Sequence, residues 1–208
     1  MFEHHVQKSF STIREMLIDR GEDVSSMLHM SPEDAAVVAS VSSTVFHLDI
    51  PSCKYRIVYN LNLSFKLPEI KKLLSVLDDG GEISNIIVVT RDKATSTSKK
   101  GLDDHIRRAL QFFRISELQF NISRHELVPK HVAIRSEEEI EKLVGSFRAR
   151  SRYNFPIISC TDPMARYLAL KPGQMVRILR FSPSSGMYTS YRCCSTIPLN
   201  MSAASATK

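Results

Sequence analysis

A β-hairpin predicted near the C-terminal end constrains the fold more than any other stretch of the chain. Residues 175–180 (MVRILR) and 187–192 (MYTSYR) are both rich in apolar, β-branched or aromatic side chains. Between them lies the sequence SPSSG, in which Pro183 fixes its own φ and Gly186 can adopt a positive φ. Two runs of this kind, joined by a short loop that contains glycine, predict two antiparallel strands.

The two tyrosines of the second predicted strand are expected on opposite faces of the sheet. Tyr188 and Tyr191 are separated by an odd number of residues, and side chains alternate along a strand. Which of the two faces the core depends on the order of strands in the sheet, which the sequence does not reveal; Tyr191, in line with Thr189 and Cys193, is our choice for the inward side chain. Tyr188 is then the side chain available to a partner.

Charge is distributed unevenly along the chain of 208 residues. Residues 1–123 hold 15 Lys and Arg against 16 Asp and Glu, a net charge of −1, whereas residues 124–208 hold 13 against 6, a net charge of +7. A basic part of this kind predicts an acidic partner, either a nucleic acid or an acidic protein face. A basic surface that is only solvated is the alternative.

The four cysteines, Cys53, Cys160, Cys193 and Cys194, contain no C-x-x-C pair. Cys193 and Cys194 are adjacent and would alternate faces on a strand. This pattern predicts free thiols in a reducing compartment. The chain opens with no secretory signal and has no apolar run of membrane-spanning length, so we expect a soluble intracellular protein without membrane contact.

Helical and strand periods alternate in residues 1–123, which predicts an α/β N-terminal domain. The predicted helices are residues 2–20, 32–38, 68–79 and 102–113. The predicted strands are residues 45–48, 55–59, 83–90 and 118–122, of which the apolar run at 83–90 is expected in the centre of the sheet. Gly21 is expected to end the first helix, and Ser31 is expected to cap the second, with Pro32 at its first position.

Residues 124–194 predict a second, small α+β domain with a mixed sheet, with the boundary placed where the charge changes. Its predicted elements are a helix at 136–147, a strand at 155–159, a short helix at 164–170 and the hairpin. Ser136 and Glu139 have the spacing of a capping box at the start of the first of these helices. Residues 195–208 are small and polar and are expected to fray.

Three sequence motifs in this second part together resemble one protein family. They are HELVPKHV at 125–132, DPMARYLALKPGQ at 162–174 and the hairpin at 175–192. In the same order, they are similar to the fifth subunit of eukaryotic nuclear DNA-directed RNA polymerases and to its archaeal RNA polymerase counterpart, with this chain a divergent member. The resemblance is strong over residues 124–192 and rests mainly on element order over residues 1–123.

The resemblance implies a non-catalytic polymerase subunit, present in one copy per complex in the nucleus. Residues 124–194 would be an assembly domain that docks on the largest subunit and contacts other polymerase subunits. Residues 1–123 would be a jaw domain with a restriction-nuclease-like fold beside downstream duplex DNA. The residues expected in assembly are His125, Glu126, Leu127, Val128, Pro129, His131, Asp162, Pro163, Arg166, Tyr167, Arg180, Gly186, Tyr188, Tyr191 and Arg192.

A polar loop after the apolar strand is a candidate DNA contact. Its cations and hydroxyl groups are those of Lys93, Thr95, Ser96, Thr97, Ser98, Lys99 and Lys100. Lysines supply charge to phosphates and hydroxyl groups supply donors, so the set suits backbone contact. The loop interleaves no aromatic residues, so we expect no base readout. A loop that is only solvated is the alternative.

Neither catalysis nor metal binding is expected of this chain. Pro129 occupies the place of the second histidine that an HExxH zinc site would need after His125. A restriction-type Mg²⁺ nuclease would use Asp49 with Glu69 and Lys71, but on the predicted helix the last two lie about 200° apart. We therefore expect no catalytic residues, metal or cofactor. A stand-alone nuclease and a regulatory adaptor built on a polymerase assembly domain are the alternatives.

Overall fold

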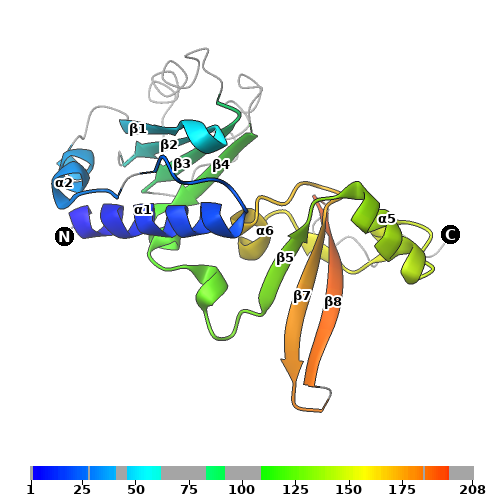
Figure 1. Ribbon diagram of the computed structural model, residues 1–208. Helices are drawn as coiled ribbons and strands as arrows, with labels where there is room; N and C mark the ends of the chain where they lie inside the picture. Colours follow the sequence, from blue (N-terminus) through cyan, green and yellow to red (C-terminus); the bar gives the residue numbers. More distant parts are fainter. Residues whose placement is uncertain are drawn as a thin grey trace. The chain divides into compact units, whose positions relative to one another are not determined.

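The computed structural model describes residues 2–27, 29–40, 46–61, 83–91, 109–184 and 186–196. The chain divides into a first unit, Met1–Phe120, and a second unit, Asn121–Lys208 (Figure 1). The predicted domain boundary after residue 123 stays a prediction. The predicted helix at 68–79, the candidate DNA loop from residue 92 onward and the tail from residue 197 lie outside the described residues.

The first helix of the first unit, α1 (Phe2–Asp19), ends as the sequence predicts. Gly21 has φ of 81°, a left-handed conformation that glycine adopts without a steric cost. Its amide donates to the Ile18 carbonyl at 2.9 Å, and the Glu22 amide donates to the Leu17 carbonyl at 3.0 Å. These two bonds satisfy carbonyl groups that would otherwise be unpaired at the helix end.

The second helix, α2 (Pro32–Ser40), begins with a reciprocal capping interaction. The Asp34 amide donates to the Ser31 hydroxyl oxygen at 3.0 Å, and the Ser31 amide donates to the Asp34 carboxylate at 3.3 Å. The predicted cap at Ser31 is therefore confirmed.

A mixed four-stranded sheet forms the centre of the first unit, in the order β1-β2-β3-β4 (Figure 1). Its strands are β1 (Phe46–Ile50), β2 (Tyr55–Asn60), β3 (Asn85–Thr90) and β4 (Ala109–Arg114). A short 3₁₀ turn, η1 (Pro51–Cys53), joins β1 to β2. β1 runs antiparallel to β2, whereas β2, β3 and β4 are parallel neighbours. β3 is thus an interior strand with almost every residue buried, as its apolar run predicts.

Two of the predicted elements near the end of the first unit are wrong. The apolar spacing predicts a helix over residues 109–113, but these residues lie in β4, which is paired with β3 over its whole length. Tertiary pairing with a buried neighbour overrides an apolar spacing that fits either structure. The strand expected at 118–122 is replaced by two 3₁₀ turns, η2 (Ile115–Leu118) and η3 (Ile122–Arg124).

Local side-chain hydrogen bonds favour these turns over a strand. The Glu117 carboxylate accepts from the Arg114 amide at 3.3 Å, and the Asn121 side chain accepts from the Ser123 amide at 2.9 Å. Bonds of this kind offer the backbone an alternative to a sheet ladder.

Helix α1 packs on the sheet of the first unit through buried polar contacts as well as apolar ones. The Ser9 hydroxyl lies 3.1 Å from the Tyr59 hydroxyl, and both residues are buried. Arg20 donates to the Gln111 side chain at 2.8 Å, which ties the end of α1 to β4. Because buried polar groups cost free energy unless they are paired, these contacts fix where the helix lies on the sheet.

The second unit contains its own four-stranded sheet, in the order β5-β7-β8-β6; Figure 1 labels β5, β7 and β8. The strands are β5 (Lys130–Ile134), β6 (Ile157–Ser159), β7 (Met175–Ser182) and β8 (Gly186–Ser195). The pair β7–β8 is the predicted hairpin, and its strands reach further toward the turn than expected, to Ser182 and Gly186. β5 is antiparallel to β7, and β6 is parallel to β8, so the sheet is mixed.

Helix α5 (Glu137–Ser146) packs on one face of this sheet, at the end away from the hairpin turn (Figure 1). The core on that face consists of the buried residues Ile134, Ile140, Phe155, Met175 and Cys193. Tyr191 packs against this cluster, and its ring meets the Phe147 ring edge-on at a centroid distance of 5.6 Å. Tyr191 is therefore the inward-facing tyrosine, as predicted.

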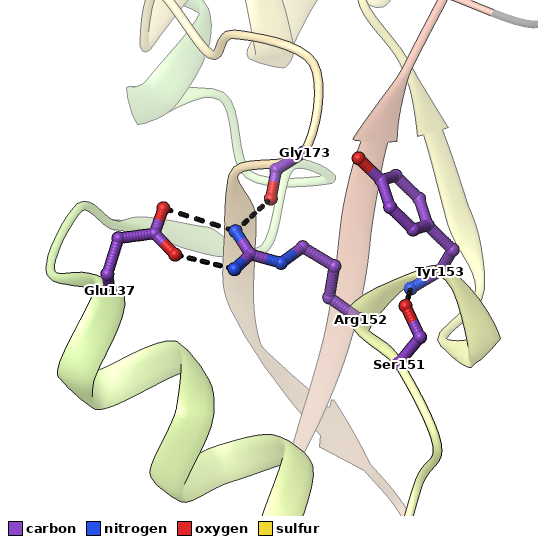
Figure 2. Close-up of polar contacts among 5 residues, drawn as sticks. All are labelled: Glu137, Ser151, Arg152, Tyr153 and Gly173. Atoms are coloured by element: carbon purple, nitrogen blue, oxygen red, sulfur yellow. Dashed lines mark hydrogen bonds and ion pairs between the residues drawn. The ribbon is translucent and has the colours of Figure 1, made fainter.

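The predicted capping box at the start of α5 is wrong in its contacts. Ser136 stands at the N-cap position, but its side chain makes no capping hydrogen bond. Instead, the Glu137 carboxylate accepts from both terminal nitrogens of Arg152, at 2.5 and 3.1 Å (Figure 2). Arg152 lies in the 3₁₀ turn η4 (Arg152–Asn154), so a long-range ion pair fixes this end of the helix instead of a local box.

The short helix α6 (Pro163–Tyr167) begins at the predicted cap. The Asp162 carboxylate accepts from the Met164 amide at 2.8 Å and from the Ala165 amide at 3.4 Å. Pro163 occupies the first helical position, where a missing amide proton has no cost.

Candidate docking surface

Strand register gathers several of the predicted assembly residues on one face of the second unit. His131 is paired with Ile178, and Ile178 with Ser190. Arg180 is paired with Tyr188, and this pair lies two residues closer to the hairpin turn than the pair Ile178–Ser190. Since paired residues share a face and side chains alternate, this face carries a set that we call the basic face: His131, Arg180, Tyr188 and Arg192.

The basic face lies opposite the face that α5 covers. Tyr191 and Cys193 are out of phase with it along β8 and belong to the α5 cluster. Tyr188 keeps 40% of its surface exposed. The hairpin thus presents one tyrosine to the core and the other to solvent.

His131 is held in one orientation at the edge of the basic face. Its Nδ1 lies 2.6 Å from the Pro129 carbonyl oxygen, which can only accept, so Nδ1 carries the proton. Burial lowers the pKa of His131 from 6.5, and the positive charges of Arg180 and Arg192 lower it further. The hydrogen bond to Pro129 and the negative charge of Asp162 raise this pKa, but the net shift is downward. The imidazole is therefore neutral at neutral pH and contributes a ring nitrogen acceptor instead of a charge.

The two arginines of the basic face differ in how they are held. Arg192 donates from Nη1 to the Ile157 carbonyl oxygen at 3.0 Å, which anchors its guanidinium group beside β6. Nε of Arg180 is buried and has no hydrogen-bond partner among the residues that the structure describes. An unpaired buried donor costs free energy, so Arg180 is the member of this face that would gain most from an added acceptor.

The turn of the hairpin requires its glycine. Gly186 has φ of 66°, as predicted, and a Cβ atom built there would meet nothing within 4 Å. Space is therefore available, and only backbone conformation selects glycine. The turn also exposes two apolar side chains that sequence reasoning missed: Phe181 and Met187, paired across the strands and 75% and 66% exposed. Alternation along the strands puts both on the face of Tyr191 and Cys193 and would predict them buried; they are exposed because they lie beside the turn, away from the cluster under α5.

Residues of the DPMARY motif act mainly within the fold. Asp162 and Pro163 form the start of α6, and Tyr167 is buried, with its hydroxyl 3.5 Å from that of Ser123. Arg166 is half-buried in the last turn of α6. The structure brings Asp162 near His131, but it gives Tyr167 a structural position.

The HELVP segment forms an exposed turn before β5. The His125 side chain accepts from the Leu127 amide at 3.2 Å, and the Val128 amide donates to the His125 carbonyl at 2.9 Å. Leu127 is 84% exposed, and Glu126 is exposed beside it. Pro129 is half-buried and supplies the carbonyl that orients His131.

The candidate DNA loop, from Lys93 to Lys100, lies outside the described residues, as do Glu69 and Lys71 of the nuclease alternative. Asp49, the remaining member of that alternative, is described. Its carboxylate accepts from Arg56 at 2.5 and 2.8 Å, and this hydrogen bonding lowers the pKa of Asp49. Both oxygens are thus occupied by a guanidinium group, an arrangement that competes with metal binding.

Metal-site and membrane-spanning features are both absent from the described ranges. No three His, Cys, Asp or Glu side chains of that part of the chain gather as a metal site. Among the helices that the structure describes, none has the length and apolar character to cross a membrane.

Comparison with known proteins places these features in a family. The model described as RNA polymerase Rpb5, C-terminal domain, matches residues 120–194. The chain is 29% identical over 188 residues to the DNA-directed RNA polymerases I, II, and III subunit rpabc1 of Dictyostelium discoideum, covering 88% of this chain and 93% of that protein. It is 32% identical over 149 residues to the subunits RPABC1 of Caenorhabditis briggsae and Caenorhabditis elegans, covering 71% of this chain and 69% of each relative.

Proposed function

The chain belongs to the family of the fifth subunit of DNA-directed RNA polymerases, and from this premise we propose how it takes part in transcription. It is a non-catalytic subunit of the polymerase complex. Its second unit docks on the largest subunit, and its first unit forms part of the jaw beside downstream duplex DNA. The complex contains one copy and acts in the nucleus. The relatives are named as subunits of polymerases I, II and III, and the same shared membership is proposed here.

The observation that supports the docking proposal is that the basic face lies within the residues that the family model matches. The matched residues, 120–194, cover nearly all of the described part of the second unit. Within them, strand register places His131, Arg180, Tyr188 and Arg192 on one face. An exposed aromatic ring on the same face as two guanidinium groups is typical of residues that dominate protein interfaces.

The charges of the basic face indicate the chemistry of the partner surface that it would bind. Arg180 and Arg192 lie near the His131 ring and influence its pKa. Two guanidinium groups on one face favour carboxylate or carbonyl acceptors on the partner. We therefore propose that the largest subunit presents an acidic or carbonyl-rich segment to the basic face.

We assign the first unit, as the jaw domain, a restriction-nuclease-like fold without catalytic activity. The mixed sheet with its parallel strands β2, β3 and β4 supports this assignment. The Asp49–Arg56 ion pair supports the absence of cleavage, because the carboxylate that a Mg²⁺ site would use is neutralised by a guanidinium group. The DNA contact is assigned to Lys93, Lys99 and Lys100 and the hydroxyl groups between them.

The experiment that tests this function is a native pull-down of the tagged full-length chain from nuclease-treated extract. We expect the two largest polymerase subunits to co-purify in amounts stoichiometric with the tag. Recovery of the chain without them would overturn the proposal. A Mg²⁺-dependent cleavage assay on the purified chain tests the nuclease alternative, and we expect no cleavage above that of an Asp49→Asn variant.

A further inference from the structure

Two cysteine sulfur atoms from distant parts of the second unit lie in direct contact. Sγ of Cys160 is 3.0 Å from Sγ of Cys194, although the two residues are 34 positions apart in the chain. A disulfide bond has an S–S distance of about 2.05 Å, so bond formation requires the sulfur atoms to approach by only about 1 Å. From this contact we infer that Cys160 and Cys194 are a modification site, which a two-electron thiol oxidant such as hydrogen peroxide converts to an intramolecular disulfide.

The backbone holds both cysteines in place, so the contact is not an accident of two loose side chains. The Cys160 amide donates to the Ser195 carbonyl at 3.0 Å, next to Cys194 in β8. The Cys194 amide donates to the Gln174 carbonyl at 2.8 Å, and its own carbonyl accepts from Gly173 at 2.9 Å. Strand β6 pairs with β8 directly before Cys160. These bonds keep the two sulfur atoms together in the folded state.

The two cysteines differ in accessibility, which sets the order of events. Cys160 is half-buried and can meet a small oxidant, whereas Cys194 is fully buried. Burial, with the Cys160 contact, raises the pKa of Cys194 to about 12, so this thiol is a poor first nucleophile. Cys160 therefore reacts first, and Cys194 resolves the product.

The chemistry balances without any further reactant. The Cys160 thiolate attacks one oxygen of the peroxide, the O–O bond breaks, and a sulfenic acid and one water form after proton transfer. Cys194 then attacks the sulfenic sulfur, the S–S bond forms, and a second water leaves. The two thiols lose two hydrogen atoms and two electrons, and the peroxide is reduced to two waters.

The other two cysteines are suited to serve as controls. Cys193 is adjacent to Cys194 but points to the opposite face of β8, into the cluster under α5. Cys53 belongs to the first unit, where its Sγ contacts the Ile50 carbonyl oxygen at 3.9 Å. Neither has the contact that a bridge with Cys160 requires. The inference does not depend on the polymerase role.

The test exposes the reduced full-length protein, in its folded state, to a small excess of hydrogen peroxide and then blocks remaining thiols by alkylation. We expect an intact mass about 2 Da lower before alkylation, two fewer alkylated thiols, and a peptide that links Cys160 to Cys194. Dithiothreitol should restore all four thiols. Cys53→Ser should form the same bridge at the wild-type rate, Cys193 should remain a free thiol when Cys160 and Cys194 are bridged, and Cys160→Ser should form no bridge.

Cys160→Ser is the main variant because Cys160 is half-buried, and serine there is better tolerated than at the fully buried Cys194. Its folding is checked by a thermal melt before oxidation. A bridge through Cys53 or Cys193, an equal bridge in Cys160→Ser, or oxidation of Cys160 to sulfinic acid without any bridge would each overturn the inference.

Discussion

The guanidinium group of Arg152 joins the first turn of α5 to the turn that precedes β7. Nη1 and Nη2 contact the Glu137 carboxylate at 3.1 and 2.5 Å, and Nη1 also donates to the Gly173 carbonyl at 3.3 Å (Figure 2). One side chain thus links three segments of the second unit. A two-pronged arginine–carboxylate contact is more directional than a single lysine contact, because both donors of the fork are engaged.

This contact predicts a pH-dependent stability difference. The hydrogen bond from Arg152 lowers the pKa of Glu137 from 4.5. Since the folded state favours the ionised carboxylate, the stabilisation is complete above pH 4.5 and is lost as the pH falls through the lowered folded value. We expect Glu137→Gln to lower the melting temperature at pH 7, with the difference from wild type shrinking as the pH falls below 4.5.

Glu138→Gln is the matched control, because it removes a charge from the same helical turn without touching Arg152. Melts of all three proteins from pH 7 to pH 3 make the comparison. Equal behaviour of the two variants at every pH would show that only the helix dipole, and not the Arg152 contact, matters at this end of α5.

Gly186 is predicted to be intolerant of side chains for a backbone reason alone. Its φ is 66° and the space around it is open, so Gly186→Val should cost about 1–3 kcal/mol through strain without any clash. Gly186→Asn should cost less, because asparagine visits the left-handed region more readily. Gly145→Ala is the control, since Gly145 lies in α5 with open space around it and alanine should stabilise the helix by about 0.5–1 kcal/mol. Denaturant unfolding measures all three, and an equal cost for valine and asparagine would refute the explanation.

The tyrosines of β8 are predicted to have separable roles. Tyr191→Ala removes an edge-on contact with Phe147 and packing against the α5 cluster, so it should cost about 2 kcal/mol of stability. Tyr188→Ala should leave the melting temperature nearly unchanged, because this side chain is 40% exposed and lies outside that cluster. It should instead reduce recovery of the largest subunit in the pull-down. A Tyr188 variant that assembles like wild type would remove this residue from the docking surface.

Local chemistry accounts for what the sequence predicts correctly in this chain. The caps at Ser31 and Asp162, the end of α1 at Gly21 and the turn at Gly186 each depend on neighbouring residues alone. Long-range pairing accounts for the failures. Residues 109–113 have an apolar spacing that fits a helix, and only their pairing with β3 makes them a strand. Similarly, the α5 terminus is fixed by Arg152, 15 residues beyond Glu137, and not by the capping box that the local spacing favours.

In the candidate docking surface, too, local features can be predicted from the sequence and long-range ones cannot. Opposite faces for Tyr188 and Tyr191 follow from an odd separation, which the sequence displays. The meeting of His131 with Arg180 and Arg192 depends on the register between β5 and β7, which no local pattern specifies. The resemblance assigns Tyr167 to assembly, but this residue of α6 is buried by tertiary packing.

The lysine cluster of the candidate DNA loop predicts a salt-dependent effect on template retention. Replacement of Lys93, Lys99 and Lys100 by Glu should weaken retention of duplex DNA by the assembled polymerase. It should also flatten the dependence of log affinity on log salt by up to roughly 0.9 for each lost phosphate contact. Incorporation of the chain into the complex should be unchanged, which the pull-down checks. The same salt slope as wild type would identify the loop as only solvated.

The central claim, that the basic face of the second unit contacts the largest polymerase subunit, is tested most directly by site-specific photo-crosslinking in the assembled complex. A photoreactive phenylalanine placed at position 188, at the end of the basic face nearest the hairpin turn, should form a crosslink to the largest subunit upon irradiation. The same group at the exposed position of Glu141, on α5 and the opposite face, is the control and should form none. A crosslink from position 141 to the largest subunit, with none from position 188 in a complex that has incorporated the chain, would contradict the account.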